Sequence, residues 1–222
     1  MTPSSDGFSA FRETAQLAGE VIGVLLAGVI IGAWGAIKNK KISVLWKRKH
    51  EQRLIEAHSQ IHEILTELRI TVRACRCLIF QFHNGGSFAD GSSIKRFSVT
   101  HESCSTLSQT MILESQDVLL SRYSSLMEIL ETQPGKILAV NTLPMSAFRS
   151  SLEINSVEYF SIVPLRCSDG ISPLGFLVCH WCSSDSLDEI ESEGISQSSI
   201  ESIIVDSANT VNSHLIYKTG KQ

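Results

Sequence analysis

Seventeen consecutive residues near the N-terminus, Val21 to Ile37 (VIGVLLAGVIIGAWGAI), carry no charge. A helix needs about 20 mostly apolar residues to span a bilayer core, and about 17 is the lower limit. The preceding residues 16–20 extend this run if Glu20 lies at the outer interface. The sequence therefore predicts a transmembrane helix at 16–37 after a short outer N-terminus, 1–15. The alternative, a helix buried in a soluble core, is disfavoured by four glycines in so short a segment.

A basic segment follows immediately. Residues 38–49 contain six Lys and Arg residues and no acidic residue. Since basic residues next to a membrane helix stay on the cytoplasmic side, we expect a single-pass protein of the cell (inner) membrane, with its N-terminus outside and its large domain in the cytoplasm. A cleaved signal peptide is the competing interpretation, but its N-terminal region should be basic, and Ala33-Trp34-Gly35 is only a mediocre cleavage site.

The charge of the remaining chain limits its partners. The whole chain has a formal charge of -4, while 38–49 carries +6 and 1–20 carries -2, so 50–222 carries -8. An acidic domain argues against a nucleic-acid partner, because phosphate contacts need Lys and Arg on one face. Six cysteines in a chain of this size and apolar content fit a reducing compartment, and we expect buried free thiols.

Small residues recur at helical spacing in the predicted anchor. They form two series four residues apart: Gly19 and Gly23, then Gly28, Gly32 and Ala36. Residues at this spacing share a helix face, and small ones let a second backbone approach closely. The pattern indicates a homodimer, although small residues are also common in membrane helices that do not associate.

A linker helix is expected at 50–75. Its seam positions follow steps of four and three residues with His58 in the one polar slot; the apolar members are Leu54, Ile61, Leu65, Leu68, Val72 and Cys75. Two interpretations fit about three heptads: a parallel coiled coil continuing from the membrane, or a helix packed on the following domain. We expect dimerisation near the membrane and packing on the domain further along.

From residue 76 the hydrophobic period changes to two. Strands are expected at 76–83 and 94–102, then a helix within 105–131, a strand at 136–141, a short helix at 146–152, strands at 158–167 and 174–182, and a helical region at 186–218 that Gly194 interrupts. The fold class predicted is α+β, in a domain at 76–218.

The last strand pair reads YFSIVPLRCSDGISPLGFLVCHW, and its "VPL…LGFL" pattern resembles the closing hairpin of GAF domains. The resemblance covers about 50–218 and is similar in element order as well. It implies an antiparallel sheet flanked by helices, a regulatory module that binds a small ligand or a partner, and dimerisation through the terminal helices. The chain shows no cyclic-nucleotide signature and no cysteine placed for bilin attachment, and the related PAS fold is a weaker match.

The candidate site comes from strand alternation. Gln81 and His83 share one face of the first strand, and Arg96 and Ser98 share one face of the second, while phenylalanines take the opposite, core face. Together with Asn84 beside Gly85-Gly86, these five residues predict a basic, hydrogen-bonding surface for an anionic or amide-rich ligand. The competing interpretation is a strand-end network in which His83 or Asn84 bonds the loop.

Metal and catalytic sites are not expected. Cys179 and Cys182 form a CxxC spacing, but on a strand they point to opposite faces. No catalytic motif is present. We therefore expect a non-enzymatic sensory or regulatory membrane protein, with an unidentified cofactor if any and a separate protein effector. The alternative is a structural or interaction protein, such as a phage or assembly component, that uses the fold without a ligand.

Overall fold

The computed structural model describes residues 51–87, 93–167, 170 and 172–219, with side chains up to 215. The predicted anchor at 16–37, its small-residue series and the basic segment lie outside these residues. Within them, no helix has the length and apolar character needed to cross a bilayer. The chain divides into two compact units with the boundary after Leu54, and the second unit is the domain described below.

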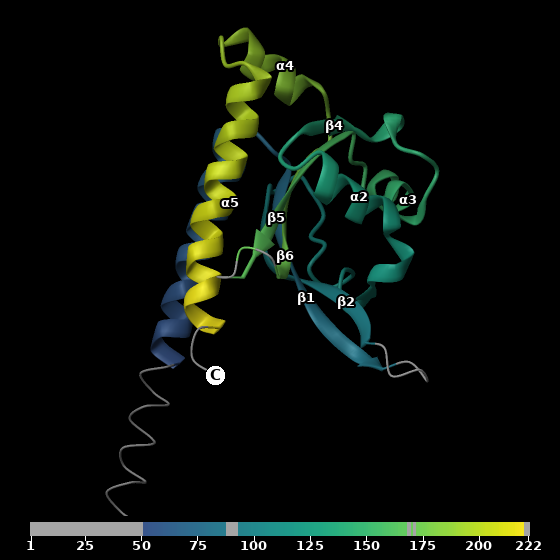
Figure 1. Ribbon diagram of the computed structural model, residues 1–222. Coiled ribbons are helices and arrows are strands. Elements are labelled where there is room, and N and C mark those ends of the chain that lie inside the picture. The colour runs from purple at the N-terminus through teal and green to yellow at the C-terminus, as the bar shows by residue number, and fades with distance from the viewer. Residues whose placement is uncertain (1–50, 88–92, 168–169, 171, 220–222) are drawn as a thin grey trace, which may run out of the picture. The chain divides into compact units, whose positions relative to one another are not determined.

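The domain is built on one six-stranded antiparallel sheet (Figure 1). Its strands are β1 (Arg76–Ser87), β2 (Ser93–Cys104), β3 (Val118–Leu119), β4 (Ile137–Ala139), β5 (Tyr159–Arg166) and β6 (Pro173–Trp181), in the order β3-β2-β1-β6-β5-β4. The helices are residues 51–71, α2 (Ser124–Thr132), α3 (Ala147–Ile154), α4 (Asp185–Ser192) and α5 (Gln197–Thr219), and the 3₁₀ turns are Leu120–Arg122 and Val140–Thr142. The predicted α+β class and all five predicted strands are confirmed, and β3 is an additional strand that was not predicted.

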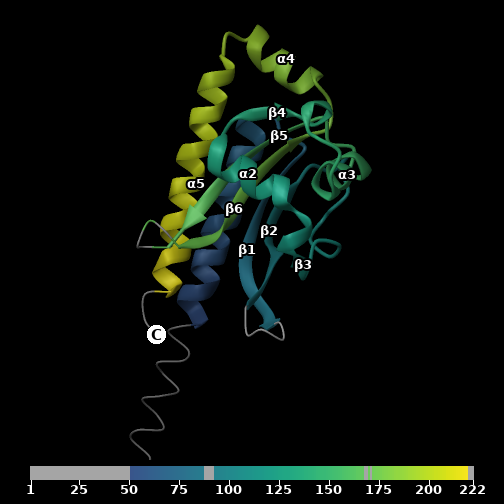
Figure 2. The ribbon, with the colours of Figure 1, turned by 45° about the vertical axis from the view of Figure 1, so that its right-hand side comes forward.

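Helix 51–71 and α5 cover one face of the sheet and lie side by side in both ribbon views (Figures 1 and 2). Ile61, Leu65, Leu68 and Val72 of the predicted seam are at most 2% exposed and pack against sheet residues such as Ile79 and Leu177. This stretch of the seam is therefore filled by the domain's own sheet. The described residues give no support to a coiled coil there, and packing on the domain is confirmed.

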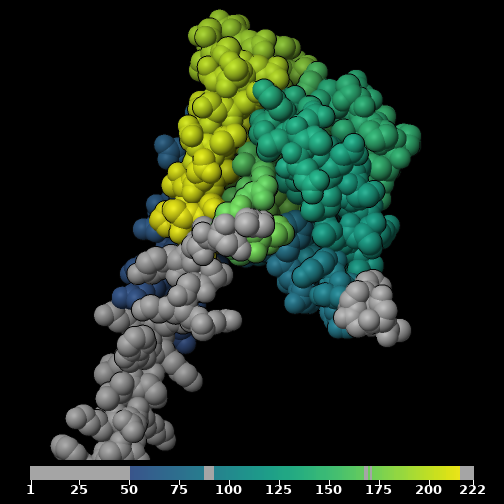
Figure 3. Space-filling view, in the orientation of Figure 1, coloured from purple at the N-terminus to yellow at the C-terminus, as the bar shows by residue number. Residues whose placement is uncertain are grey.

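The other face of the sheet carries a second core. α2, α3 and the connections around them pack on the phenylalanines of β1, β2, β5 and β6: Phe80, Phe97, Phe160 and Phe176. In the space-filling view the side chains of these segments form a continuous layer on that side of the domain (Figure 3, teal to green). The phenylalanine row thus marks a core face, as alternation predicted.

A β-bulge changes the alternation within β2. Ile79 pairs with His101 and Phe80 pairs with Val99, so Thr100 is the extra residue. Strict alternation from Phe97 places His101 on the phenylalanine face and Glu102 on the opposite face. The bulge reverses both: His101 stacks on His58 of helix 51–71, while the Glu102 carboxylate accepts hydrogen bonds from the backbone amides of the 111–112 loop.

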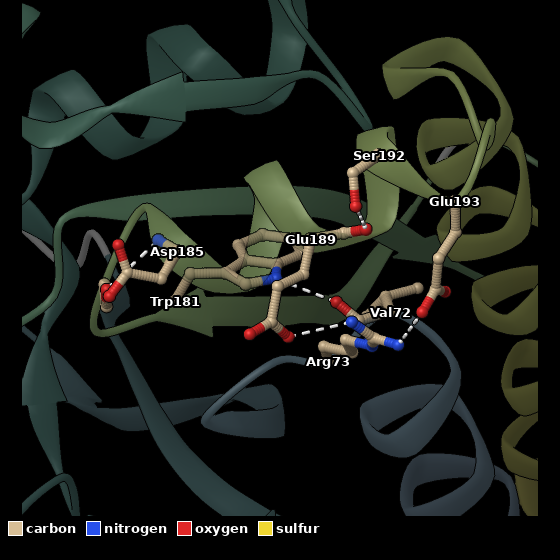
Figure 4. Close-up of polar contacts among 8 residues, drawn as sticks. Val72, Arg73, Trp181, Asp185, Glu189, Ser192 and Glu193 are labelled. Carbon is tan, nitrogen blue, oxygen red and sulfur yellow. Dashed lines mark hydrogen bonds and ion pairs between the residues drawn. The ribbon is translucent and has the colours of Figure 1, made fainter.

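The end of helix 51–71 is held to β6 and α4 by polar contacts (Figure 4). The indole of the fully buried Trp181 donates a hydrogen bond to the carbonyl of Val72 at 2.9 Å. Arg73 then pairs with Glu189 on α4 at 2.8 Å and with Glu193, the residue that follows α4, at 2.5 Å. Exposed ion pairs of this kind contribute little each, so the buried indole contact is the stronger link.

The cysteines differ in part from the expectation of free thiols. Cys75 and Cys182 form a disulfide, with 6.0 Å between their Cα atoms, so the expectation was wrong for this pair. Cys77 and Cys179 are buried thiols on paired positions of β1 and β6, with their sulfur atoms 3.4 Å apart. Cys179 lies on β6 and Cys182 just after it, and they contact different cysteines, Cys77 and Cys75.

Candidate functional site

An aromatic cavity of about 50 Å³ lies between the sheet and α2 and α3. Its floor is formed by phenylalanines of three neighbouring strands, and α2 and α3 close it from above; the lining residues are Phe80, Phe97, Met111, Ser115, Val118, Tyr123, Leu126, Phe148, Ser151, Leu152, Phe176, Val178 and His180. The strands place these rings together because Phe80 pairs with Phe176 across β1 and β6, and their rings stack at 4.8 Å. The lining is mostly apolar, with a few polar groups.

His180 supplies a buried polar group at this cavity. The residue is 3% exposed, and its Nδ1 atom has no hydrogen-bond partner among the described residues. Burial, with a smaller contribution from the charge of Arg76, lowers the pKa of His180 to about 3. The ring is therefore neutral near pH 7, and Nδ1 can donate or accept a hydrogen bond according to the tautomer.

The residues predicted for the site meet elsewhere, on the β1–β2 hairpin. The register pairs Gln81 with Ser98 and His83 with Arg96, as the alternation argument required. His83 Nε2 lies 2.9 Å from the Ser98 hydroxyl, and Arg96 lies 3.1 Å from the carboxylate of Asp117, which precedes β3. These four residues share the sheet face that carries Ile79, and they do not line the aromatic cavity.

Asp117 is the member of this cluster that sequence reasoning missed. Its backbone has a φ of 60°, and its amide donates a hydrogen bond to the Ser98 hydroxyl at 2.8 Å. Its carboxylate lies 3.8 Å from His83 Nε2. Asp117 stands 19 positions after Ser98 in the sequence. It joins the cluster because β3 pairs with β2, so no local sequence pattern indicated it.

Asn84 lies at the exposed end of the hairpin. Its side-chain oxygen accepts hydrogen bonds from the Ser93 hydroxyl at 3.2 Å and from the Lys95 ammonium at 3.0 Å. Gly85 leaves space for the guanidinium of Arg96. A Cβ atom added at Gly85 would lie 2.3 Å from Arg96 Nε. Most polar groups of these hairpin residues are thus paired with one another, as in the strand-end arrangement weighed against a ligand site, while Arg96 Nε has no hydrogen-bond partner among the described residues.

The part of the chain that the structure describes contains no group of three His, Cys, Asp or Glu side chains placed to hold a metal ion. The cavity lining contains no cysteine among the described residues. What the cavity can do chemically is to enclose a small apolar group and offer it one hydrogen bond from the neutral His180 ring.

Comparison with known proteins identifies similar folds but does not identify a function. No family model matches the chain, and no curated protein matches it. Among solved structures, the red-light-absorbing state of a red/green cyanobacteriochrome matches with 17% identity and a TM-score of 0.50, over 75% of this chain and 98% of that one.

Two further structures match more weakly. The phycocyanobilin-bound GAF domain of a cyanobacterial phytochrome matches with 18% identity over 79% of this chain and 95% of that one, at a TM-score of 0.46. The blue-light-absorbing PixJ GAF domain of Thermosynechococcus elongatus matches with 11% identity, over 75% of this chain and 92% of that one, also at 0.46. At these identities the likeness supports a GAF-like fold alone.

Proposed function

We propose that this protein is a membrane-anchored sensory or regulatory protein whose GAF-like domain binds a small ligand in the aromatic cavity. The observation that carries the proposal is an unfilled apolar space beside His180, whose ring nitrogen has no partner among the described residues. Native interiors seldom leave a buried polar atom unpaired, so a hydrogen-bonding ligand at this position would satisfy Nδ1.

The cavity limits the class of ligand. A volume of about 50 Å³ suits a small apolar group and not an extended tetrapyrrole, and the described lining has no cysteine for covalent attachment. The bilins named for the structural neighbours are therefore not carried over to this chain. The ligand proposed is a small, mostly apolar molecule with one group that can hydrogen-bond a neutral imidazole.

The remaining parts of the proposal rest on the sequence. The anchor at 16–37 would hold the domain at the cytoplasmic face of the cell (inner) membrane, and the chain would act as a homodimer that signals to a separate protein effector without a catalytic step. A second ligand surface, the hairpin residues Gln81, His83, Asn84, Arg96 and Ser98, stays in the proposal because its basic groups lie at the surface.

Native mass spectrometry of the full-length chain, purified in detergent, tests this function. We expect the wild-type protein to retain a small molecule. Ser151→Val adds apolar volume inside the cavity and should abolish retention, while the neighbouring Ser150→Val, outside the lining, should leave it unchanged. His83→Ala separates the two surfaces, because loss of the molecule in that variant would move the ligand to the hairpin.

The alternative function is a structural or interaction module without a ligand. It is favoured by the small size of the cavity and by the mutual hydrogen bonding of the hairpin residues. A wild-type chain with no added mass, together with a Ser151→Val variant that is more stable than the wild type, would establish this alternative and sink the ligand-binding proposal.

A further inference from the structure

A second cavity, of about 180 Å³, lies at the opposite end of β1 from the hairpin, where β1 begins. It is distinct from the aromatic cavity, and the two share no lining residue. The walls come from the loop after β2, the end of α3 and the end of β6; the residues are Arg76, Leu107, Ser108, Gln109, Ile154, Asn155, Ser156 and Cys182. The cavity is therefore assembled from four separate segments of the chain.

Arg76 is the charged group in this cavity, and it is 2% exposed. Its guanidinium donates hydrogen bonds to the carbonyls of Gln109 and Asn155, each at 2.8 Å, and one weaker contact reaches the Cys182 sulfur at 3.8 Å. These contacts use three of the five N–H groups of an arginine. The Nε atom has no hydrogen-bond partner among the described residues.

The positive charge of Arg76 has no ion-pair partner among the described side chains. Glu102 is near enough to act on it through space, but its carboxylate accepts hydrogen bonds from the Thr110 hydroxyl and from the amides of Met111 and Ile112. Neutral carbonyls and a sulfur are what the guanidinium contacts directly. Since buried charges in proteins are normally paired with an opposite charge, an anion is the missing component of this cavity.

Two aliphatic side chains stand at the mouth of the same cavity. Leu107 is 98% exposed and Ile154 is 83% exposed, which makes them the two most exposed large hydrophobic residues among those described. They come from different segments, the β2–β3 connection and the last residue of α3. An exposed apolar rim beside a buried cation is the arrangement expected around a ligand that is both apolar and anionic.

We propose that this cavity binds a small organic acid, with its carboxylate on the guanidinium of Arg76 and its apolar group against Leu107 and Ile154. A guanidinium matches the geometry of a carboxylate, and a charge-assisted hydrogen bond in a partly dry cavity is stronger than a neutral one. The volume is below the 300–1,000 Å³ typical of drug-sized ligands, so the acid is small.

Calorimetric titration of the full-length protein with 4-methylpentanoate tests the proposal, under non-reducing conditions that keep the Cys75–Cys182 disulfide. The uncharged 4-methylpentanamide, of the same shape, is the matched probe. We expect the acid to bind and the amide to bind at least about tenfold more weakly, because a factor of ten is about 1.4 kcal/mol and hydrogen bonds to charged groups contribute more than neutral ones.

Leu107→Glu is the main variant, because this side chain is exposed and its replacement should leave folding intact. The new carboxylate repels the ligand, so we expect binding to weaken about tenfold or more. Ile70→Glu adds the same charge on helix 51–71, which covers the other face of the sheet, and should leave binding unchanged. Arg76→Met should abolish binding. Circular dichroism of this variant is compared with that of the wild type, so that a loss of binding is not confused with a loss of folding.

Three results would overturn the proposal. These are equal affinity for the acid and the amide, unchanged affinity in Leu107→Glu, and no heat of binding with millimolar acid. The proposed function is tested separately, since Ser151→Val should still bind 4-methylpentanoate and Leu107→Glu should still retain the molecule held in the aromatic cavity.

Discussion

His180 shows at the residue scale how burial becomes a dependence of stability on pH. Its pKa in the native protein is about 3, while an imidazole in the unfolded chain titrates near 6.5. Between these values the unfolded chain binds a proton that the native protein does not, so the free energy of unfolding decreases as the pH falls. The slope is half of about 1.4 kcal/mol per pH unit at pH 6.5 and approaches the full value below pH 5.5, so about 2 kcal/mol is lost between pH 6.5 and 4.5.

Urea denaturation at several pH values measures this effect, with His180→Phe as the variant that cannot titrate. We expect the wild type to lose about 2 kcal/mol more than the variant between pH 6.5 and 4.5, with no difference in slope above about pH 8. Parallel curves for the two proteins over the whole range would show that His180 is protonated in the native state and would contradict its burial as a neutral ring.

Sequence alternation placed single residues correctly as far as the strands stay regular. It put Phe97 and Val99 on a core face, and both are buried there. It failed after the bulge at Thr100, because an extra residue leaves no mark in a pattern of apolar and polar side chains. The burial of His180 and Arg76 was also not predicted, because the residues that surround them come from segments distant in the sequence.

At the scale of elements, β1 and β6 leave no room for a side chain at Gly175. A Cβ atom added there would lie 1.9 Å from the carbonyl oxygen of Phe80 and 2.9 Å from the Cα atom of Gln81. Both contacts are with backbone, so no side chain can move aside. The sheet pairing of Gln81 with Gly175 therefore depends on the absence of a side chain.

Gly175→Ala should destabilise the domain by about 3 kcal/mol, the upper range for overpacking a well-packed interior. The physical cause is that the added side chain forces β1 and β6 apart. Since β6 also carries Phe176, the lining of the aromatic cavity is disturbed as well. Thermal denaturation measures the loss, with Pro173→Ala, exposed at the start of the same strand, as the control. A Gly175→Ala protein as stable as the control would mean that the two backbones are further apart than described.

Most elements were predictable, including the short strand β4 and the short helix α3, but the two-residue strand β3 was not. The helical periodicity expected within 105–131 survives only in α2, because Val118 and Leu119 are taken by β2 as strand β3. A strand of only two residues, Val118 and Leu119, is too short for alternation of apolar and polar residues to be recognised in the sequence. The interruption at Gly194 was correct, since its φ of 85° ends α4 and lets α5 begin at Gln197.

At the scale of the whole molecule, residues 55–71 of the first helix and α5 run side by side along the same sheet face in opposite directions (Figures 1 and 2). The polar contacts of Arg73 and Trp181 hold the C-terminal end of helix 51–71. The seam that the sequence offered for a coiled coil is occupied by the sheet between Ile61 and Val72. If the chain forms the proposed homodimer, the contact between the two copies would then be made by the proposed anchor.

The anchor's small residues give the last prediction. In the proposed transmembrane helix, Gly28, Gly32 and Ala36 would share a helix face and would let two backbones approach closely. The double substitution Gly28→Ile and Gly32→Ile should weaken dimerisation of the full-length protein, because two bulky side chains would hold the facing backbones apart. Ala33→Ile enlarges a small residue on another face and should leave the dimer intact. Sedimentation equilibrium in detergent measures the mass of each form. The same pair of substitutions at Gly19 and Gly23 tests the other face, and an unchanged mass for both double variants would place any dimer contact outside the anchor.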